Sequence, residues 1–258
     1  MELRKIKEII YRIPFFHNKK NKPNISQGQN NKFPLDFSEE EIEILRKVKD
    51  YTMTSDERLV ALARAVDYIE NCEIDGDIVE CGVWRGGSMM MAAFKLIAMN
   101  KTSRNLFLFD TFAGMPEPTD DDKLSSNNKA AKLICAETER TSNSVWCIAT
   151  IEEVKKALEL TKYPQNKIHL IKGKVENTLP HNGIQKISIL RLDTDWYEST
   201  KHELETLFHK LEPGGVLLID DYGHWTGSQK AVDEFLKNQK IKMFLNRVDY
   251  TGRLGIKI

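Results

Sequence analysis

Residues 77–88, DIVECGVWRGGS, decide the fold class. The stretch 77–83 has the length of a buried strand and is apolar apart from Asp77 and Glu80, and Gly86 to Met99 follows with the pattern of a helix. Glycines between a strand and a helix let the backbone approach a ligand closely, beside the free N–H groups of the helix N-terminus. The turn is neither GxGxxG nor GK[ST], so no phosphate cradle with a lysine is predicted here.

The rest of the chain repeats this strand–helix alternation. Four further apolar stretches have the length of strands: 105–112, 167–174, 187–194 and 215–222. Helical patterns are found at 36–48, 54–72, 151–160, 198–215 and 228–238. The stretch 243–258 is expected to close the sheet as a hairpin around Thr251 and Gly252. We therefore predict an α/β fold with a mostly parallel seven-stranded sheet and a C-terminal antiparallel hairpin.

Residues 113–150 interrupt the alternation with little apolar pattern. A long insertion directly after the end of a strand is typical of an active-site lid, and we expect one here.

Composition and charge exclude several function classes. The chain carries 38 basic and 38 acidic side chains, and this neutral balance argues against a nucleic-acid partner. The sequence contains no run of about 18 apolar residues, so no transmembrane helix is predicted. The first residues lack the apolar centre of a signal peptide. The four cysteines include no CxxC pair, so reduced thiols in a cytoplasmic protein are expected.

The N-terminal stretch differs from the rest. Residues 1–16 alternate basic and apolar side chains at helical spacing, and 17–34 are polar and rich in Asn and Lys. We predict a basic amphipathic segment with a flexible linker at 1–35 and one domain at 36–258. Such a helix can lie on an anionic membrane, although packing against the domain or a second subunit is the favoured interpretation.

Two acids follow the first two strands. Glu80 at the glycine-rich turn suits a ligand with an ammonium group and repels a pyrophosphate. Asp110, after the second strand, can accept hydrogen bonds from two ribose hydroxyls, or it can cap a turn. Together they suggest a nucleoside that carries an amino acid, S-adenosylmethionine (SAM).

Two further pairs of acids follow the fourth and fifth strands. Asp193 and Asp195 are two residues apart and can face one crevice, and Asp220 and Asp221 end the fifth strand. The order of the segments is expected to place the fourth and fifth strands side by side. Four carboxylates at one edge of the sheet would repel one another, and a Mg²⁺ ion with oxygen ligands would remove that cost. Unrelated loop acids that are solvated or cap helices are the alternative. His224, just beyond the second pair, stays unassigned.

Several long motifs in this order resemble the macrocin O-methyltransferase family, which includes the mycinamicin and novobiocin sugar methyltransferases. The stretches that carry the resemblance, from about Asp36 to the C-terminus, are YTMTSDERL (51–59), VECGVWRGGSMMM (79–91), FDTFAGMP (109–116), KGKVENTLP (172–180), LDTDWYEST (192–200) and IDDY (219–222). Residues 1–34 and 117–145 depart from the pattern.

The resemblance implies a Rossmann-like class I SAM-dependent methyltransferase with a divalent cation, a homo-oligomer, and a small-molecule or glycan sugar hydroxyl as acceptor, in antibiotic or polysaccharide pathways. It implies that Asp193, Asp220 and Asp221 hold the cation and that Asp195 is the base. The residues that it implies for the SAM site are Thr52, Met53, Thr54, Ser55, Glu80, Gly82, Arg85, Ser88, Asp110, Thr111 and Phe112.

Two other functions remain compatible with the motifs. Apolar residues followed by Asp193-Thr-Asp195 also describe the cation site of a nucleotide-sugar glycosyltransferase, but Glu80 would then face the diphosphate. The other is a module that only binds a sugar or SAM. Against it, Asp195 beside a cation site is more than binding requires.

Overall fold

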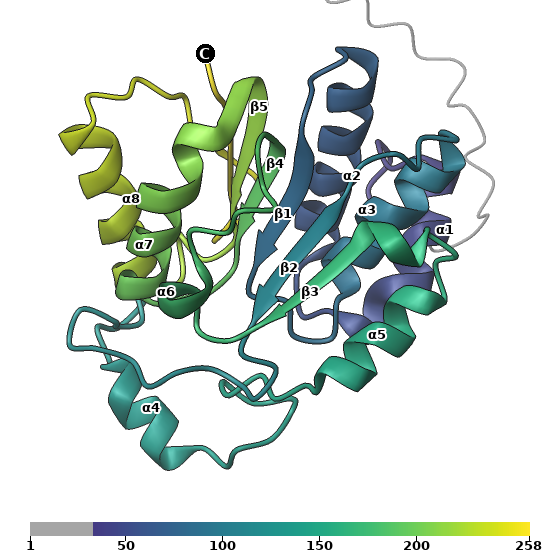
Figure 1. The fold of residues 1–258 in the computed structure, drawn as a ribbon. Coiled ribbons are helices and arrows are strands. Elements are labelled where there is room, and N and C mark those ends of the chain that lie inside the picture. Colours follow the sequence, from purple (N-terminus) through teal and green to yellow (C-terminus); the bar gives the residue numbers. More distant parts are fainter. Residues whose placement is uncertain (1–32) are drawn as a thin grey trace, which may run out of the picture. The chain divides into compact units, whose positions relative to one another are not determined.

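A seven-stranded sheet with the strand order β3-β2-β1-β4-β5-β7-β6 forms the centre of the unit Asp36–Ile258 (Figure 1). Its strands are β1 (Asp77–Cys81), β2 (Leu106–Asp110), β3 (Ile168–Lys172), β4 (Ile187–Leu192), β5 (Leu211–Ile219), β6 (Asn246–Arg247) and β7 (Arg253–Ile256). The first five strands pair in parallel, and β7 runs antiparallel to both β5 and β6. The predicted sheet and its closing hairpin are confirmed.

This computed structural model describes residues 33–258. The segment predicted at 1–35 therefore lies outside the described residues, apart from its last three positions.

Helices cover both faces of the sheet (Figure 1). One face carries α1 (Glu39–Val48), α2 (Asp56–Asn71), α3 (Gly87–Ala98) and α5 (Ile151–Glu159). The other face carries α6 (Val175–Thr178), α7 (Tyr197–Leu207) and α8 (Thr226–Asn238). No helix among residues 33–258 is long and apolar enough to cross a membrane.

Side-chain caps begin three of these helices. Ser38 and Glu41 form a capping box at α1, and Thr150 and Glu153 form another at α5. Ser55 accepts the backbone N–H of Arg58 at the start of α2. Each cap satisfies an N–H that the helix cannot, which is worth about 1 kcal/mol. The cap at Ser55 also fixes the end of the segment 52–55, which lies next to the site described below.

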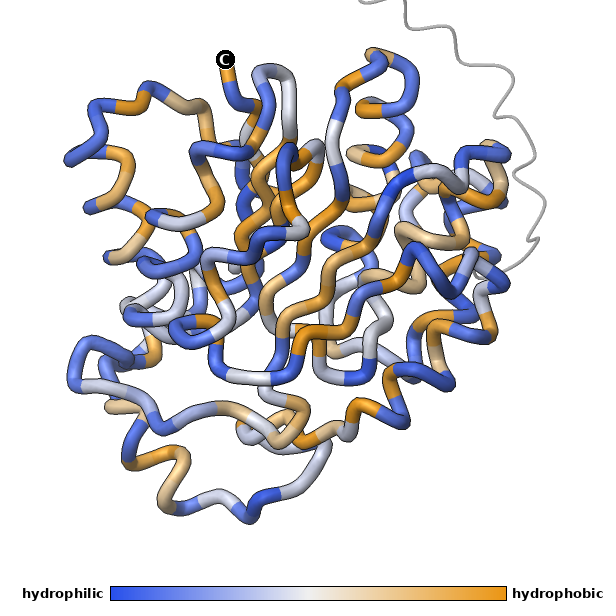
Figure 2. The backbone as a smooth tube through the Cα atoms, in the orientation of Figure 1, coloured by the Kyte–Doolittle hydropathy of each residue, from blue (hydrophilic) through white to orange (hydrophobic). Residues whose placement is uncertain are grey.

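The core lies along the strands, which Figure 2 shows as apolar stretches. Every side chain of β4 is buried, as both faces of a central parallel strand require. Two of these six side chains are polar, Ser188 and Arg191. Burial of an arginine costs free energy unless its donors are paired, so the partners of Arg191 are of interest.

One predicted helix boundary is wrong. The helix predicted at 198–215 ends at Leu207, and β5 already begins at Leu211, which pairs with Ile187 of β4. Pro213 therefore lies within the strand, near its start, where loss of one backbone donor is tolerated. The strand extends so far because a register shift between Ile187 and Ile189 lets β4 pair with both ends of β5.

The 113–150 insertion is ordered by apolar packing against the end of the sheet. It contains a short helix, α4 (Ala131–Glu137), which the sequence pattern did not predict. Trp146 of the insertion belongs to one buried cluster with Trp196 and Trp225. The Trp196 indole also donates to the Pro116 carbonyl at 2.9 Å. These contacts hold the insertion beside the segments that follow β4 and β5.

Candidate active site

A cavity of about 600 Å³ lies where the parallel strands end. Its lining comes from the residues that follow β1 to β5, from the segment Thr52–Thr54 and from the 113–150 insertion. Ligands of open α/β sheets bind at this edge, because the loops after successive strands meet there. The insertion therefore borders the cavity, and its role as a lid stays a prediction.

The glycine-rich turn after β1 brings the backbone against the loop after β4. Gly82 has a φ of +83°, and a Cβ there would lie 2.0 Å from the carbonyl oxygen of Asp193. Gly87 is also confined, since its Cβ would lie 2.6 Å from the Tyr51 carbonyl oxygen. At position 82, only glycine permits both the left-handed conformation and the close approach.

We expect Gly82→Ala to destabilise the protein by about 3 kcal/mol or more, because left-handed strain adds to overlap with the Asp193 backbone. Gly86→Ala is the matched control. Its φ is +87°, but its nearest neighbour is the side-chain methyl Cγ1 of Val154 at 3.2 Å, so about 1 kcal/mol is expected. Urea denaturation measures both losses, and equal losses would contradict the role of the backbone contact.

Asp110 ties this turn to β2. Its Oδ2 accepts the backbone N–H groups of Val83 at 2.7 Å and Trp84 at 3.1 Å, and its Oδ1 accepts that of Phe112 at 2.7 Å. Asp110 also lines the cavity. The Thr111 hydroxyl lies 3.4 Å from Oδ1, but its single proton is directed to the Gly114 carbonyl at 2.6 Å. A carboxylate has about four acceptor positions, so the three backbone bonds leave capacity for one ligand hydroxyl.

Glu80 is placed differently from the prediction that it faces a ligand. It is 1% exposed, it is absent from the cavity lining, and its Oε1 accepts Arg191 Nη1 at 2.7 Å. Burial raises the pKa of Glu80 to about 7, although Arg191 opposes this rise. Its Oε2 is buried without a hydrogen-bond partner. Contact with a cofactor ammonium group therefore stays a prediction.

Most of the other residues predicted at the SAM site reach the cavity. Those that line it are Thr52, Met53, Thr54, Gly82, Ser88 and Thr111. Ser55, Arg85 and Phe112 do not: Ser55 donates to Asp249 at 2.8 Å, and Arg85 donates to Ser142 of the insertion at 2.9 Å. Phe112 is buried, with a φ of +49°.

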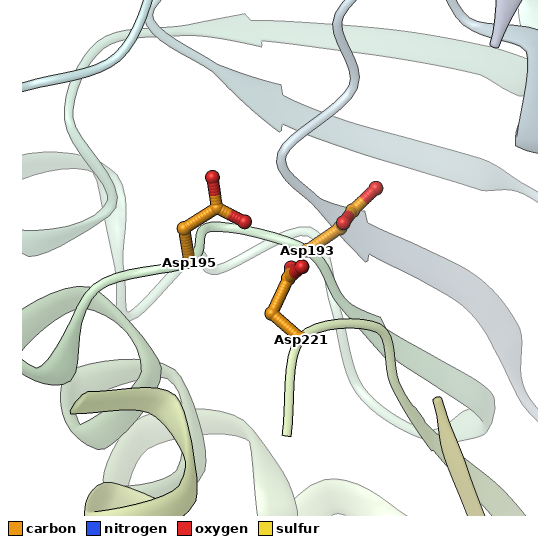
Figure 3. A group of neighbouring side chains, drawn as sticks. All are labelled: Asp193, Asp195 and Asp221. Carbon is orange, nitrogen blue, oxygen red and sulfur yellow. The ribbon is translucent and has the colours of Figure 1, made fainter. Parts of the chain in front are cut away.

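Three of the four predicted acids form one group. One carboxylate oxygen from each of Asp193, Asp195 and Asp221 lies within 4.8 Å of the other two. Figure 3 shows Asp221 pointing toward the loop that carries Asp193 and Asp195. This follows from the sheet, since β4 and β5 are neighbours and both end here. The expectation that these two strands lie side by side is confirmed.

The protonation of this group reflects burial and mutual repulsion. Burial raises the pKa of Asp193 and of Asp221 well above the usual range, and Asp220 raises both further. Burial raises the pKa of Asp195 to about 7. The Oδ2 of Asp221 is buried and has no hydrogen-bond partner. Such a group favours either bound protons or a hard cation.

Asp220 belongs to an ion-pair network beside this group. Arg58 Nη1 and Arg191 Nη2 both donate to its carboxylate, the latter at 2.5 Å, and Thr54 donates at 3.3 Å. Arg58 also pairs with Asp249 at 3.0 Å. The predicted ligand set of Asp193, Asp220 and Asp221 thus shares two members with the observed group, and the role of Asp220 stays a prediction.

The two arginines are site residues that the sequence motifs did not identify. A signal was available for Arg191: it is a charged residue within the apolar run ISILRL, directly before an acidic pair. Arg58 lies in α2 and faces the cavity, where no strand-end motif points to it.

Asp195 adopts an unusual backbone conformation. Its φ is +65°, and the Trp196 N–H donates to the Thr194 carbonyl at 2.7 Å. Left-handed conformations of residues other than glycine cost free energy and occur often at functional sites. This turn allows the Asp195 carboxylate to lie with those of Asp193 and Asp221.

His224 also lines the cavity. Its Nδ1 lies 3.0 Å from the Tyr250 hydroxyl, and its ring packs edge-on against Trp225. Burial lowers the pKa of His224, and Arg58 lowers it further. A neutral imidazole is therefore expected at the wall of the cavity near neutral pH.

Comparison with known proteins supports one family. The family model described as Macrocin-O-methyltransferase (TylF) matches residues 13–254. A 4'-O-methyltransferase of 8-demethyl-8-(2,3-dimethoxy-alpha-L-rhamnosyl)-tetracenomycin C from Streptomyces olivaceus is 31% identical over 202 residues, 78% of this chain and 74% of that protein. Mycinamicin III 3''-O-methyltransferase from Micromonospora griseorubida is 27% identical and covers 78% and 76%.

A solved structure agrees with these relatives. The O-methyltransferase NovP matches with a TM-score of 0.70 at 27% identity, over 80% of this chain and 82% of that chain. The calicheamicin methyltransferase CalS11 matches with a TM-score of 0.58 at 17% identity, which shows the shared fold.

Proposed function

This chain belongs to the macrocin O-methyltransferase family and is a SAM-dependent O-methyltransferase, and from that premise we propose that it methylates a sugar hydroxyl of a glycoside with an apolar aglycone. The observation that carries the proposal is the acidic group Asp193, Asp195 and Asp221 at the cavity, beside an apolar wall. The family assignment replaces the glycosyltransferase and the simple binding module that the motifs left open.

The names of the relatives support a sugar acceptor. Two of them are named for methylation at the 4' and 3'' positions, and one of these names specifies a rhamnosyl group.

The cavity wall supports an apolar aglycone. The insertion and its neighbours contribute the apolar side chains Met115, Leu124, Ile134, Val145 and Trp225. Arg58 and Lys174 are the cationic side chains of the lining in the described part of the chain, and Arg58 is already paired with Asp220 and Asp249. Lys174 is then the one lining cation without an ion pair in the described part of the chain, and a single lysine would neutralise the diphosphate of a nucleotide sugar only in part.

We propose further that Asp193 and Asp221 hold a divalent cation. Their oxygen atoms suit a hard cation, and the unpartnered Oδ2 of Asp221 is an acceptor that such an ion would satisfy. When bound, the cation would make a coordinated sugar hydroxyl more acidic and offset the repulsion within the group. Asp220 is the third ligand predicted from the resemblance, and its variant is compared in the Discussion.

Asp195 is proposed as the base. It lies in reach of the same space as Asp193 and Asp221, and its left-handed turn holds the carboxylate there. As a carboxylate it would accept the hydroxyl proton when the oxygen attacks the methyl carbon of SAM. The glycine-rich turn and Asp110 would hold the cofactor so that sulfur, methyl carbon and oxygen are in line, and this positioning supplies much of the rate.

Methyl transfer from SAM in the presence of Mg²⁺, measured as S-adenosylhomocysteine formed, tests the acceptor class. We expect turnover with a rhamnoside of an aromatic aglycone, and much less with free rhamnose or a nucleotide-activated rhamnose. Catechol, a vicinal diol without a sugar, is the control. Methylation of catechol with none of any glycoside would overturn the sugar proposal.

We expect Asp110→Ala to weaken S-adenosylhomocysteine binding at least about tenfold. The variant loses an acceptor for the ribose, and it frees the N–H groups of Val83 and Trp84 that shape the turn. Hydrogen bonds to charged groups are worth about 1.5–3 kcal/mol each. Calorimetric titration measures the affinity, with Asp75→Ala, an exposed acid at the other end of the sheet, as control. An unchanged affinity would refute the assignment.

The homo-oligomer predicted from the resemblance stays a prediction, which light scattering on the purified protein tests.

A further inference from the structure

Arg191 is a buried cation at the centre of the site. Its side chain is 3% exposed, within an otherwise apolar strand end, and it lies in register with Glu80 on β1. Charged side chains are seldom this buried without a specific set of partners. Its partners come from four separate segments of the chain.

The two terminal nitrogen atoms of the guanidinium each donate to two acceptors. Nη1 donates to Glu80 at 2.7 Å and to Asp193 Oδ2 at 2.6 Å. Nη2 donates to Thr54 Oγ1 at 2.9 Å and to Asp220 Oδ1 at 2.5 Å. Arg191 therefore joins β1, the segment Thr52–Thr54 and the ends of β4 and β5.

The contact with Asp193 constrains the acidic group. One oxygen of Asp193, Oδ2, is held by Arg191, whereas Asp193, Asp195 and Asp221 converge within 4.8 Å. This hydrogen bond restricts the rotation of the carboxylate and leaves Oδ1 available as an acceptor. Glu80 acts from the far side, since it is buried against the same Nη1 and holds the guanidinium in place.

Stability alone does not explain this network. Replacement of buried ion pairs by apolar residues is often neutral or stabilising, so a buried arginine with three carboxylates is weak evidence for a contribution to stability. The planar fork of arginine does, however, fix the direction of several acceptors at once, which the single ammonium group of lysine does not.

We propose that Arg191 is a positioning residue: it orients Asp193 for the cation and the acceptor, and through Thr54 it keeps the cofactor-lining segment in register with the acidic group. Glu80 then serves as the anchor of Arg191. The inference rests on the proposed function for its activity readout, and its binding readouts do not require turnover.

The test is Arg191→Lys, which keeps the charge and loses the fork. We expect kcat to fall about 100-fold, as small misplacements of reacting groups do, with Mn²⁺ affinity also reduced. The affinity for S-adenosylhomocysteine should fall by less than about tenfold. Mn²⁺ alone is measured by paramagnetic resonance and S-adenosylhomocysteine by calorimetry.

Arg104→Lys is the matched control. Arg104 is also largely buried, and it donates to Glu70, to the Ser188 hydroxyl at 3.1 Å and to the Ile74 carbonyl at 2.8 Å. Ser188 lies at the start of β4, the end of the sheet away from the cavity. This variant should lose thermal stability as Arg191→Lys does, while kcat stays close to that of the wild type.

Two outcomes would overturn the inference: an unchanged kcat in folded Arg191→Lys, or an equal loss of kcat in Arg104→Lys. If Arg191→Lys fails to fold, Glu80→Gln decides. If Glu80→Gln lowers kcat and keeps its affinity for S-adenosylhomocysteine, the result supports the role of Glu80 in holding Arg191. If the variant loses only that affinity, Glu80 binds the cofactor instead, and the proposed role is refuted. If the wild type turns over without binding Mn²⁺, the proposed cation site is contradicted. The comparison of kcat between Arg191→Lys and Arg104→Lys would still test the role of Arg191.

Discussion

Asp195→Asn should lower kcat by about 10²–10⁴, the usual contribution of a positioned general base. Asparagine keeps the size of the side chain, and it tolerates the left-handed φ of +65° at this position. The variant should therefore fold and bind S-adenosylhomocysteine normally, with little change in the KM of the acceptor. Single-turnover rates and calorimetry measure these quantities.

The pH dependence gives a second readout of Asp195. A base must be deprotonated, and burial raises the pKa of Asp195 to about 7, so activity that depends on it falls as the pH drops through its pKa. A bound cation would shift this limb to lower pH. In Asp195→Asn the limb should be absent, and part of the rate should return at high pH. Normal single-turnover chemistry at saturating Mg²⁺, with only the cation affinity lost, would make Asp195 a ligand and refute the base.

Removal of the cation should abolish turnover and leave cofactor binding largely intact. EDTA-treated wild type is expected to be inactive and to recover with Mg²⁺. Asp221→Asn is expected to reproduce this loss, because Asp221 offers the unpartnered buried oxygen Oδ2. The glycine-rich turn and Asp110 follow β1 and β2, whereas the acids follow β4 and β5; the turn touches the backbone of Asp193, so loss of a cation from the carboxylates need not disturb it. Full turnover by metal-free protein would exclude the cation site.

Asp220→Asn distinguishes the ligand set implied by the family from the group seen in the structure. If Asp220 is a ligand, Mn²⁺ affinity should fall as far as in Asp221→Asn. If Asp220 chiefly pairs with Arg58 and Arg191, Mn²⁺ affinity should change little, while thermal stability falls because two buried cations lose a partner. The same two measurements on Asp193→Asn provide the reference for a residue that belongs to both sets.

Much of the fold could be predicted from the sequence because it depends on local and periodic signals. The apolar runs, the glycines at 82, 86 and 87, and the Ser–Glu caps each specify backbone geometry within a few residues. The long motifs then identified the family, and the neighbouring positions of β4 and β5 followed from the segment order. The helix predicted at 198–215 ends earlier than expected because the pairing of Leu211 with Ile187 of β4, which is a tertiary contact, begins a strand there.

The sequence by itself determined which acids end the strands, and therefore which side chains reach the cavity edge: Asp110, Asp193, Asp195, Asp220 and Asp221. Only the tertiary structure decided how they are paired. Arg58 comes from α2, and Arg191 meets Glu80 through the register of β1 and β4. Spacing along the chain places a carboxylate at an edge. Which group pairs with each carboxylate depends on all the charges within a few ångströms of it. These charges come together only when the strands and α2 are packed.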